Sequence, residues 1–139
     1  TDIIVGFPDE TEDQFRETLS LVDEAKYESA FTFIYSPRKG TPAARMTDNV
    51  AKDIKSKRFL ELIKHLEKSV EASSNIMVGQ VYDVLVDGVS KTDSSMLSGY
   101  TESNKLVHFP GDESFVGKII KVLIKESHTY SLIGEVVNG

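Results

Sequence analysis

The sequence DIIVGFPDET at residues 2–11, together with AFTFIY at residues 30–35, decides the fold of the first part of the chain. The run at residues 2–7 is almost continuously apolar, as in strands that are covered on both faces. Gly6, Pro8 and Asp9 end this run in a turn. Residues 30–35 are rich in aromatic and β-branched side chains, which favour strands. We therefore predict two strands, each buried on both faces.

A helix is predicted between the two strands. Thr11, followed by Gln14 three residues later, has the pattern of a capping box. Apolar residues then recur at helical spacing until the helix ends near Tyr27. Strand, helix and strand in this order form a βαβ unit, with parallel pairing and a right-handed crossover. One such unit cannot cover both faces of its own strands, which indicates a severed domain. The apolar face of the helix carries Phe15, Leu19, Val22 and Ala25.

A second, amphipathic helix is predicted from about residue 49 to residue 73. It follows a loop at residues 36–42 that contains two prolines. One face of this helix is apolar, and the other is dense in lysine and glutamate, as expected for a helix packed on one side. The apolar stripe consists of Phe59, Leu62, Ile63, Leu66 and Val70.

Beyond residue 73 the periodicity changes to that of short strands. Candidate strands lie at residues 78–86, 96–107, 118–125 and 131–137, and Asp87-Gly88 is a turn signal. Short strands with regular turns predict a small closed or partly closed barrel of the OB-like kind. The expected fold is therefore α/β at residues 1–73, followed by all-β at residues 74–139. Glycines punctuate the strands at Gly99, Gly111, Gly117 and Gly134.

Composition excludes several classes of protein. The formal net charge of −6 argues against a protein that grips nucleic acid by bulk electrostatics. The chain has no cysteine, so it holds no disulfide, thiolate zinc site or cysteine-bound iron–sulfur cluster. The three histidines lack metal-ligand spacing, and no apolar run is long enough to span a membrane. We expect a cytoplasmic protein without a metal site in this stretch.

Two groups of residues are candidates for binding. The loops at residues 6–11 and 36–41 follow strand ends, where parallel sheets hold ligands, although both can be plain turns. Small β-barrels bind single strands by stacking bases on aromatic rings and tracking phosphates with lysines. The alternative is that Phe109 and Tyr130 are core residues and the lysines are merely solvated. The RNA-facing candidates are Tyr100, Thr101, Asn104, Lys105, Phe109, Lys118, Lys121 and Tyr130.

The motifs resemble one family along the whole chain. The stretches DIIVGFPDET (2–11) and AFTFIYSPRKGTPAA (30–44) resemble the end of the catalytic barrel in the MiaB-type methylthiotransferases, which are radical-SAM enzymes. The stretches MLSGYT (96–101), NKLVHFPG (104–111) and TYSLIGE (129–135) resemble the TRAM domain of the same family. The resemblance implies the last part of a radical-SAM barrel followed by a TRAM β-barrel.

The resemblance also implies a function. The family adds a methylthio group to an isopentenylated adenosine beside the tRNA anticodon, with one S-adenosylmethionine giving the radical and another the methyl group. Its iron–sulfur clusters are held by cysteines that would precede Thr1. The fragment alone is therefore expected to be inactive, and no catalytic residue is assigned within it. The TRAM part is expected to position the tRNA anticodon stem-loop. The cofactor-side residues are expected to be Ile4, Val5, Phe33, Tyr35 and Arg38.

Three positions depart from the family pattern. Asp9 replaces a glycine; if the position needs a positive φ, aspartate is among the better substitutes. Tyr100 replaces an arginine, which removes a cation but supplies a ring. Tyr130 stands where tryptophan is common and keeps an aromatic surface.

Other hypotheses remain open at this point. The chain could be a stand-alone, non-catalytic RNA-binding module. The parent enzyme could act on a ribosomal-protein aspartate or on threonylcarbamoyladenosine, as relatives do. The severed barrel strands, finally, are expected to pair with or swap into a second copy, or to become disordered.

Overall fold

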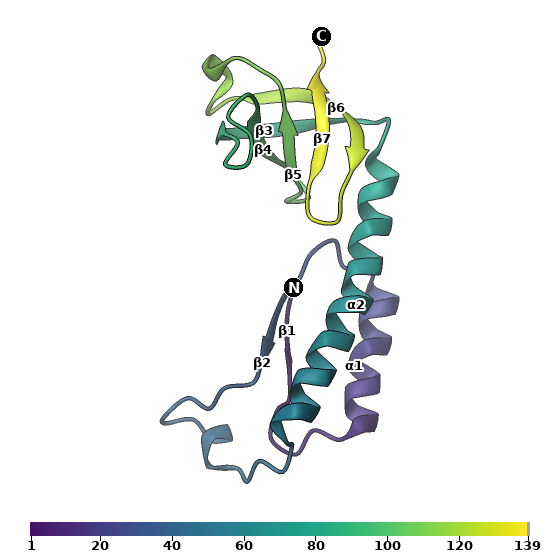
Figure 1. The fold of residues 1–139 in the computed structure, drawn as a ribbon, viewed down its shortest axis with the longest axis vertical. Coiled ribbons are helices and arrows are strands. Elements are labelled where there is room, and N and C mark those ends of the chain that lie inside the picture. Colours follow the sequence, from purple (N-terminus) through teal and green to yellow (C-terminus); the bar gives the residue numbers. More distant parts are fainter. Residues whose placement is uncertain (139) are drawn as a thin grey trace. The chain divides into compact units, whose positions relative to one another are not determined.

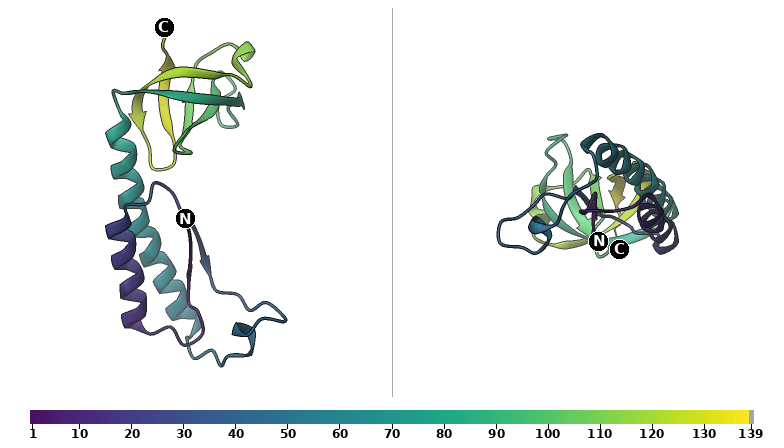
Figure 2. Two further views of the ribbon diagram at one scale, coloured as in Figure 1. Left: turned by 180° about the vertical axis from the view of Figure 1, so that it is seen from behind. Right: turned by 90° about the horizontal axis from the view of Figure 1, so that it is seen from below.

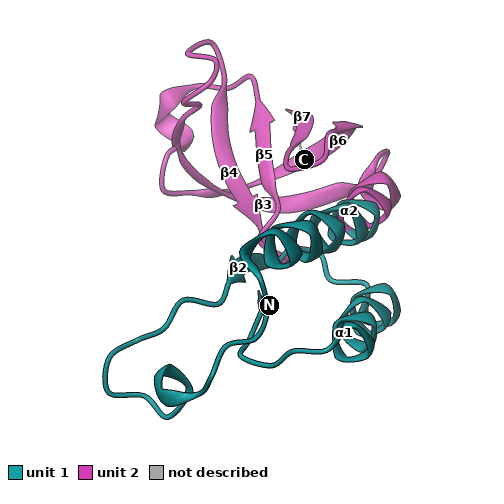
Figure 3. Cartoon of the chain, turned by 60° about the horizontal axis from the view of Figure 1, so that its bottom comes forward, with its two compact units in different colours: residues 1–69 teal, residues 70–139 magenta. Residues whose placement is uncertain are grey.

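The computed structural model describes residues 1–138 and divides the chain into two compact units (Figure 3). Unit 1 is Thr1–Ser69 and unit 2 is Val70–Gly139. The division falls inside one continuous helix, α2 (Lys52–Met77), whereas the sequence placed it after residue 73. Each unit has a hydrophobic core of its own, and we describe each by itself.

Unit 1 begins with the predicted βαβ arrangement. Strand β1 (Asp2–Val5), helix α1 (Glu12–Ala25) and strand β2 (Phe31–Ile34) follow one another, and β1 pairs with β2 in parallel, as predicted (Figure 1). The capping box is confirmed: Gln14 N donates to Thr11 Oγ1 at 3.2 Å, and Thr11 N donates to Gln14 Oε1 at 3.0 Å. A single 3₁₀ turn, η1 (Ala43–Arg45), interrupts the segment that leads to α2.

The helices cover only one face of the β1–β2 pair. The core of unit 1 joins Val5 of β1 to apolar residues of α1 and of the first part of α2, and Figure 2 shows these helices on the same side of the strands. Ile4 and Phe33, which are direct neighbours in the sheet, keep 55% and 50% of their surface exposed. The prediction of strands buried on both faces is therefore wrong for this chain, because no described element covers the second face. The core residues are Val5, Phe15, Leu19, Val22, Leu62 and Leu66.

The turn between β1 and α1 is held tightly against α2. Gly6 and Asp9 both adopt positive φ angles, of 73° and 63°, so the positive φ that we considered for Asp9 is confirmed. Arg58 donates to the carbonyl of Glu10 at 2.8 Å and pairs with its carboxylate at 3.1 Å. The same carboxylate accepts a hydrogen bond from Gly6 N at 3.1 Å. A buried ion pair thus fixes the backbone at the strand end.

Unit 2 is a closed barrel, as the sequence predicted. Its strands are β3 (Val81–Val89), β4 (Leu97–Thr101), β5 (Leu106–Phe109), β6 (Ile119–Ser127) and β7 (Leu132–Val136). They close in the order β3-β4-β5-β7-β6, and β5–β7 is the parallel pair among these strands. A 3₁₀ turn, η2 (Glu113–Phe115), lies between β5 and β6. The buried core is Met77, Val84, Val86, Leu97, Val107, Phe109, Val122, Ile124 and Leu132.

Two local predictions in unit 2 are wrong. Asp87-Gly88 is not a hairpin turn but lies inside β3, at a bulge between Val86 and Gly88. Gly99 and Gly134 do not separate strands but lie within β4 and β7. A Cβ at Gly99 would lie 2.3 Å from the carbonyl oxygen of Leu85, and one at Gly134 would lie 2.6 Å from that of Leu123. These glycines allow neighbouring strands to approach closely where the barrel curves.

Candidate nucleic-acid interface

An apolar row crosses four adjacent strands on the outside of the barrel. Leu106 of β5 lies opposite Tyr100 of β4, Tyr100 lies opposite Leu85 of β3, and Leu85 lies opposite Ile119 of β6. Tyr100, Leu85 and Ile119 expose 42%, 53% and 68% of their surface. Side chains directly opposite one another on a sheet lie close together, with Cβ atoms about 4.5–5.5 Å apart. The four residues form one surface, which we call the Tyr100 row.

The strand alternation explains why this row points outward. Val84 and Val86 of β3 are fully buried in the barrel core, so Leu85 between them must face the other way. An outward leucine beside an outward isoleucine and tyrosine gains nothing from burial within the barrel. Contiguous exposed apolar surface of this kind marks a site of interaction.

Charges near the row are mixed rather than strongly basic. Lys121 is exposed and pairs with Asp83 at 2.9 Å across β3 and β6. Lys118, which precedes Ile119, is exposed as well. The pKa of Asp112 is lowered, mainly by the hydrogen bond from the Ser114 side chain, and least by the positive charge of Lys118. The surface therefore offers a stacking ring and a few local cations, and not a large positive field.

Three of the predicted RNA-facing residues are buried, and their assignment to the RNA-facing surface is wrong. Phe109 is fully buried in the barrel core, so its ring is not available to a base. Thr101 and Lys105 are also buried, because they close the turn between β4 and β5. Lys105 N donates to Thr101 Oγ1 at 3.1 Å, and its ammonium donates to Ser74 Oγ at 3.3 Å. This lysine holds the barrel to the end of α2.

Two further candidates lie in turns away from the Tyr100 row. Asn104 is exposed and has a φ of 63°, so the turn between β4 and β5 by itself explains an asparagine there. Tyr130 exposes 70% of its surface in the turn between β6 and β7, which excludes the alternative that it is a core residue. The structure thus places Tyr100 on β4 and Lys121 on β6, the two strands that pair with β3, with Lys118 directly before β6. Asn104 and Tyr130 lie in turns.

Sequence reasoning missed Leu85 and Ile119. A signal for both was present, because each stands one position out of phase with an inward-facing apolar series. Leu85 breaks the alternation of Val84 and Val86, and Ile119 precedes Ile120 and Val122. The outward-facing positions were hard to recognise because a continuous apolar run is usually interpreted as a strand buried on both faces.

The cofactor-side candidates in unit 1 divide between the two faces of the sheet. Ile4 and Phe33 lie on the exposed face, whereas Val5 is fully buried against the helices, so its assignment to the cofactor side is wrong. The Tyr35 ring meets Phe7 edge to face at 5.2 Å between centroids. The Tyr35 hydroxyl is buried and has no hydrogen-bond partner among residues 1–138. Arg38 is exposed in the loop that follows β2.

The described part of the chain offers neither a cluster of metal ligands nor a membrane-spanning helix. No three histidine, aspartate or glutamate side chains within residues 1–138 come close enough together to hold a metal ion. Over that range, no helix is both long and apolar enough to cross a membrane.

The barrel matches a known RNA-binding domain. The TRAM domain model matches residues 76–137, which include every strand of unit 2. Unit 2 is therefore a TRAM domain.

The similarity to known proteins extends beyond the barrel to nearly the whole chain. The chain is similar to curated proteins named tRNA-2-methylthio-N(6)-dimethylallyladenosine synthase, which confirms the resemblance to the MiaB-type methylthiotransferases. It is 53% identical over 139 residues to the one from Oceanobacillus iheyensis, covering 100% of this chain and 27% of the relative. It is 51% identical over 138 residues to the one from Geobacillus kaustophilus, covering 99% of this chain and 26% of the relative. It is 50% identical over 137 residues to the one from Alkaliphilus oremlandii, covering 99% of this chain and 29% of the relative. The chain thus spans just over a quarter of the length of these relatives.

Proposed function

We propose that this chain is the part of a cytoplasmic tRNA-modifying enzyme that contributes the end of the catalytic barrel and positions the tRNA. The Tyr100 row carries the proposal. It puts an exposed aromatic ring on a TRAM barrel in a chain whose net charge is −6, and Lys118 and Lys121 lie at the β6 end of the row, next to and two residues after Ile119. Base stacking contributes about 1–3 kcal/mol per base, without needing a basic surface. The RNA is the anticodon stem-loop of a tRNA, whose unpaired loop bases can reach such a ring.

The reaction of the parent enzyme is the addition of a methylthio group to an isopentenylated adenosine beside the anticodon. The names of the similar proteins support this substrate over threonylcarbamoyladenosine and over a ribosomal-protein aspartate. The chain has no cysteine, so its residues do not fit an iron–sulfur cluster. Because the cluster ligands must come from elsewhere in the parent, we expect residues 1–139 alone to be inactive.

The open face of the β1–β2 sheet suits S-adenosylmethionine in the parent enzyme. Ile4 and Phe33 offer apolar surface beside the strand ends, and the buried Tyr35 hydroxyl has no partner among the described residues. Arg38, on the loop that follows, is available to the carboxylate of the ligand. Bound there, S-adenosylmethionine would supply the radical and the methyl group. The side chains named here would bind and orient it and would exclude water.

The same open face leads to a second proposal, for the isolated chain. Phe31 and Phe33 are both exposed on β2, and an exposed apolar strand pair recruits another strand or sheet. We therefore expect residues 1–139 to self-associate through this face. Sedimentation velocity over a range of concentrations tests this, with the double variant Phe31→Ser/Phe33→Ser expected to remain monomeric. A wild-type chain that is monomeric at all concentrations contradicts the proposal.

A binding measurement tests the RNA function directly. We expect residues 1–139 to bind a labelled anticodon stem-loop in fluorescence anisotropy, and to bind a blunt duplex of the same length much more weakly. The duplex is the control because its bases are already stacked and paired. Equal binding to both, or no binding to the stem-loop at low salt, contradicts the proposed role.

The alternative of a stand-alone RNA-binding module has one observation in its favour. Unit 2 forms a compact unit with its own core. If residues 70–139 alone bind the stem-loop with the same affinity as the whole chain, the module is favoured. Binding that also needs unit 1 favours the enzyme fragment.

A further inference from the structure

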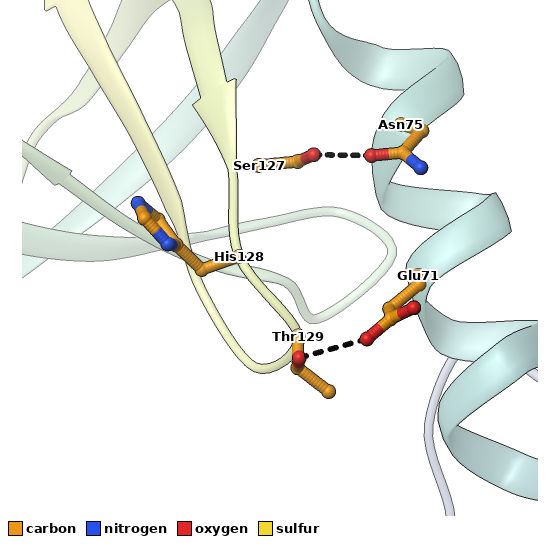
Figure 4. Close-up of a pocket in the computed structure, with 5 residues that line it drawn as sticks. All are labelled: Glu71, Asn75, Ser127, His128 and Thr129. Atoms are coloured by element: carbon orange, nitrogen blue, oxygen red, sulfur yellow. Dashed lines mark hydrogen bonds between the residues drawn. The ribbon is translucent and has the colours of Figure 1, made fainter.

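A polar cleft lies within unit 2, between the end of α2 and the turn that joins β6 to β7 (Figure 4). Its volume is about 310 Å³, at the lower end of the range of about 300–1,000 Å³ that is usual for small-molecule sites. Every side chain that lines it is polar, and none is a lysine or arginine. The lining residues are Glu71, Asn75, Ser127, His128 and Thr129.

Two hydrogen bonds across the cleft fix its main polar groups. Thr129 Oγ1 donates to Glu71 Oε1 at 3.1 Å, and Ser127 Oγ donates to Asn75 Oδ1 (Figure 4). Glu71 and Asn75 are four residues apart on α2, so they lie one above the other on the same face. Figure 4 shows the His128 ring pointing away from this helix. The cleft therefore presents the ends of Glu71 and Asn75 side by side.

The bonds to the two hydroxyls leave a definite hydrogen-bonding pattern. A carboxylate has about four lone-pair sites, and the Thr129 hydroxyl uses one of them. The amide oxygen of Asn75 accepts from Ser127, so its amide nitrogen is the end that donates. Within residues 1–138 that nitrogen has no hydrogen-bond partner. Together the two side chains offer the two acceptor oxygens of the carboxylate and, beside them, the donor NH₂ group of the amide.

This pattern is complementary to one edge of one nucleobase. The Watson–Crick edge of guanine presents two neighbouring N–H donors, on N1 and N2, followed by the O6 acceptor. Adenine and cytosine present one donor group to the carboxylate, and uracil places carbonyl oxygens on both sides of its N3–H group. A phosphate is disfavoured because the cleft carries the negative charge of Glu71 and is lined by neither lysine nor arginine.

The position of the cleft fits an RNA ligand. In OB-like barrels the loop between the fourth and fifth strands is one of the segments that contact oligonucleotides, and here that loop joins β6 to β7. Tyr130, with most of its surface exposed, lies in the same turn as Thr129. We propose that the Glu71–Asn75 cleft binds the Watson–Crick edge of an unpaired guanine in the RNA, an assignment that rests on the proposed RNA-binding function.

The test compares two single-stranded RNA pentamers, UUGUU and UUIUU, which differ only in the guanine 2-amino group that inosine lacks. Titrated into residues 1–139, UUGUU is expected to bind about tenfold more tightly, because one hydrogen bond to a charged group contributes about 1.5 kcal/mol. The amide resonances of Asn75 and Thr129 are expected to shift. Equal affinity for the two pentamers overturns the proposal.

Two variants separate recognition from structure. Glu71→Gln keeps an acceptor for Thr129 but replaces one acceptor oxygen with a donor, so the preference for UUGUU should disappear while the thermal midpoint is unchanged. Asn75→Asp keeps the acceptor for Ser127 but loses the donor to O6, and should weaken UUGUU binding. Glu113→Gln, which makes the same charge change outside the cleft, is the control and should bind as wild type. If Glu71→Gln still prefers UUGUU over UUIUU as strongly as the wild type does, the proposal is overturned.

The anticodon stem-loop distinguishes this proposal from the function on which it rests. Stem-loop binding with no preference between the pentamers overturns the guanine site and leaves the RNA function standing. A pentamer preference without stem-loop binding supports the guanine site and contradicts the proposed tRNA role.

Discussion

The two units differ in how completely each covers its own strands. Unit 2 closes its strands into a ring around a core, so every strand has two neighbours. Unit 1 has one pair of parallel strands with helices on one face, and exposed Ile4 and Phe33 on the other. Parallel strands joined by a helical crossover normally belong to sheets covered on both faces. The comparison shows that unit 2 covers its own strands on every side, whereas unit 1 leaves one face of its two-stranded sheet exposed.

The largest expected effect concerns the hydrophobic core of unit 1, on the face of the sheet that the helices cover. Phe15 is fully buried between β1 and the two helices, so Phe15→Ala should lower the free energy of unfolding by about 3–5 kcal/mol. Leu60→Ala, on the exposed side of α2, is the control and should change it by less than about 0.5 kcal/mol. Urea unfolding followed by circular dichroism measures both. Similar losses in the two variants would show that unit 1 has no core of its own.

The next effect tests the closure of the barrel. A methyl group at Gly99 would overlap the backbone of Leu85, so Gly99→Ala should destabilise unit 2 by about 3 kcal/mol. Gly88→Ala is the matched control, because a Cβ at Gly88 in the neighbouring strand meets nothing within 4 Å. Thermal unfolding of both variants gives the comparison. A tolerated Gly99→Ala would mean that β3 and β4 are not pressed together as the closed barrel requires.

A third prediction concerns function rather than stability. Tyr100→Ala should weaken anticodon stem-loop binding by about 1–3 kcal/mol, the usual contribution of one stacked base, while Tyr100→Phe should keep most of the affinity. Ile76→Ala, an exposed apolar residue on α2, is the control. Anisotropy titrations measure all of them. Unchanged affinity in Tyr100→Ala would contradict the assignment of RNA binding to the Tyr100 row.

The smallest effect is a pH dependence that compares one aspartate from each unit. Hydrogen bonds from the Lys55 side chain and Val50 N lower the pKa of Asp48, and bonds from Ser114 lower the pKa of Asp112, both below the ordinary value of 3.8. A lowered folded-state pKa stabilises the fold above the unfolded-state pKa, and this stability is lost as the pH falls through the folded-state value.

The measurement uses Asp48→Asn and Asp112→Asn. Each should be slightly less stable than wild type at pH 6, and the difference should shrink as the pH falls below 3.8. Urea unfolding at pH 6, 5, 4 and 3 follows this. A difference that grows toward low pH would mean that these carboxylates are not stabilised in their charged form.

Much of the fold could be predicted because local signals agree with the tertiary structure. The capping box at Thr11, the βαβ order and the small barrel all follow from patterns within a few residues. The failures arose where only three-dimensional context decides. A glycine such as Gly99 usually indicates the end of a strand, yet here it lies inside β4, where the backbone of β3 approaches closely. Phe109 belongs to a stretch that combines an amide, a lysine and an aromatic ring, which suggested RNA contacts, but the strand alternation places its side chain in the core.

The site was harder to predict than the fold for the same reason. The Tyr100 row brings together β5, β4, β3 and β6 through their register, and register is not visible in the sequence alone. The cleft beside Glu71 likewise pairs a helix end with a turn more than fifty residues later in the chain. Single residues such as Tyr100 and Lys121 could be named beforehand, but their neighbours could not.

The pairing of β3 with β6 also sets the order in which the chain can mature during synthesis. Residues 81–85 must wait for residues 119–123 before the ring can close, and β7 must then enter between β5 and β6. Because pairings distant in sequence form late and slowly, a nascent chain that ends before β7 presents β6, β3, β4 and β5 as an open sheet. Such a chain is exposed to aggregation, so β7, the last strand to be made, protects the strands made before it.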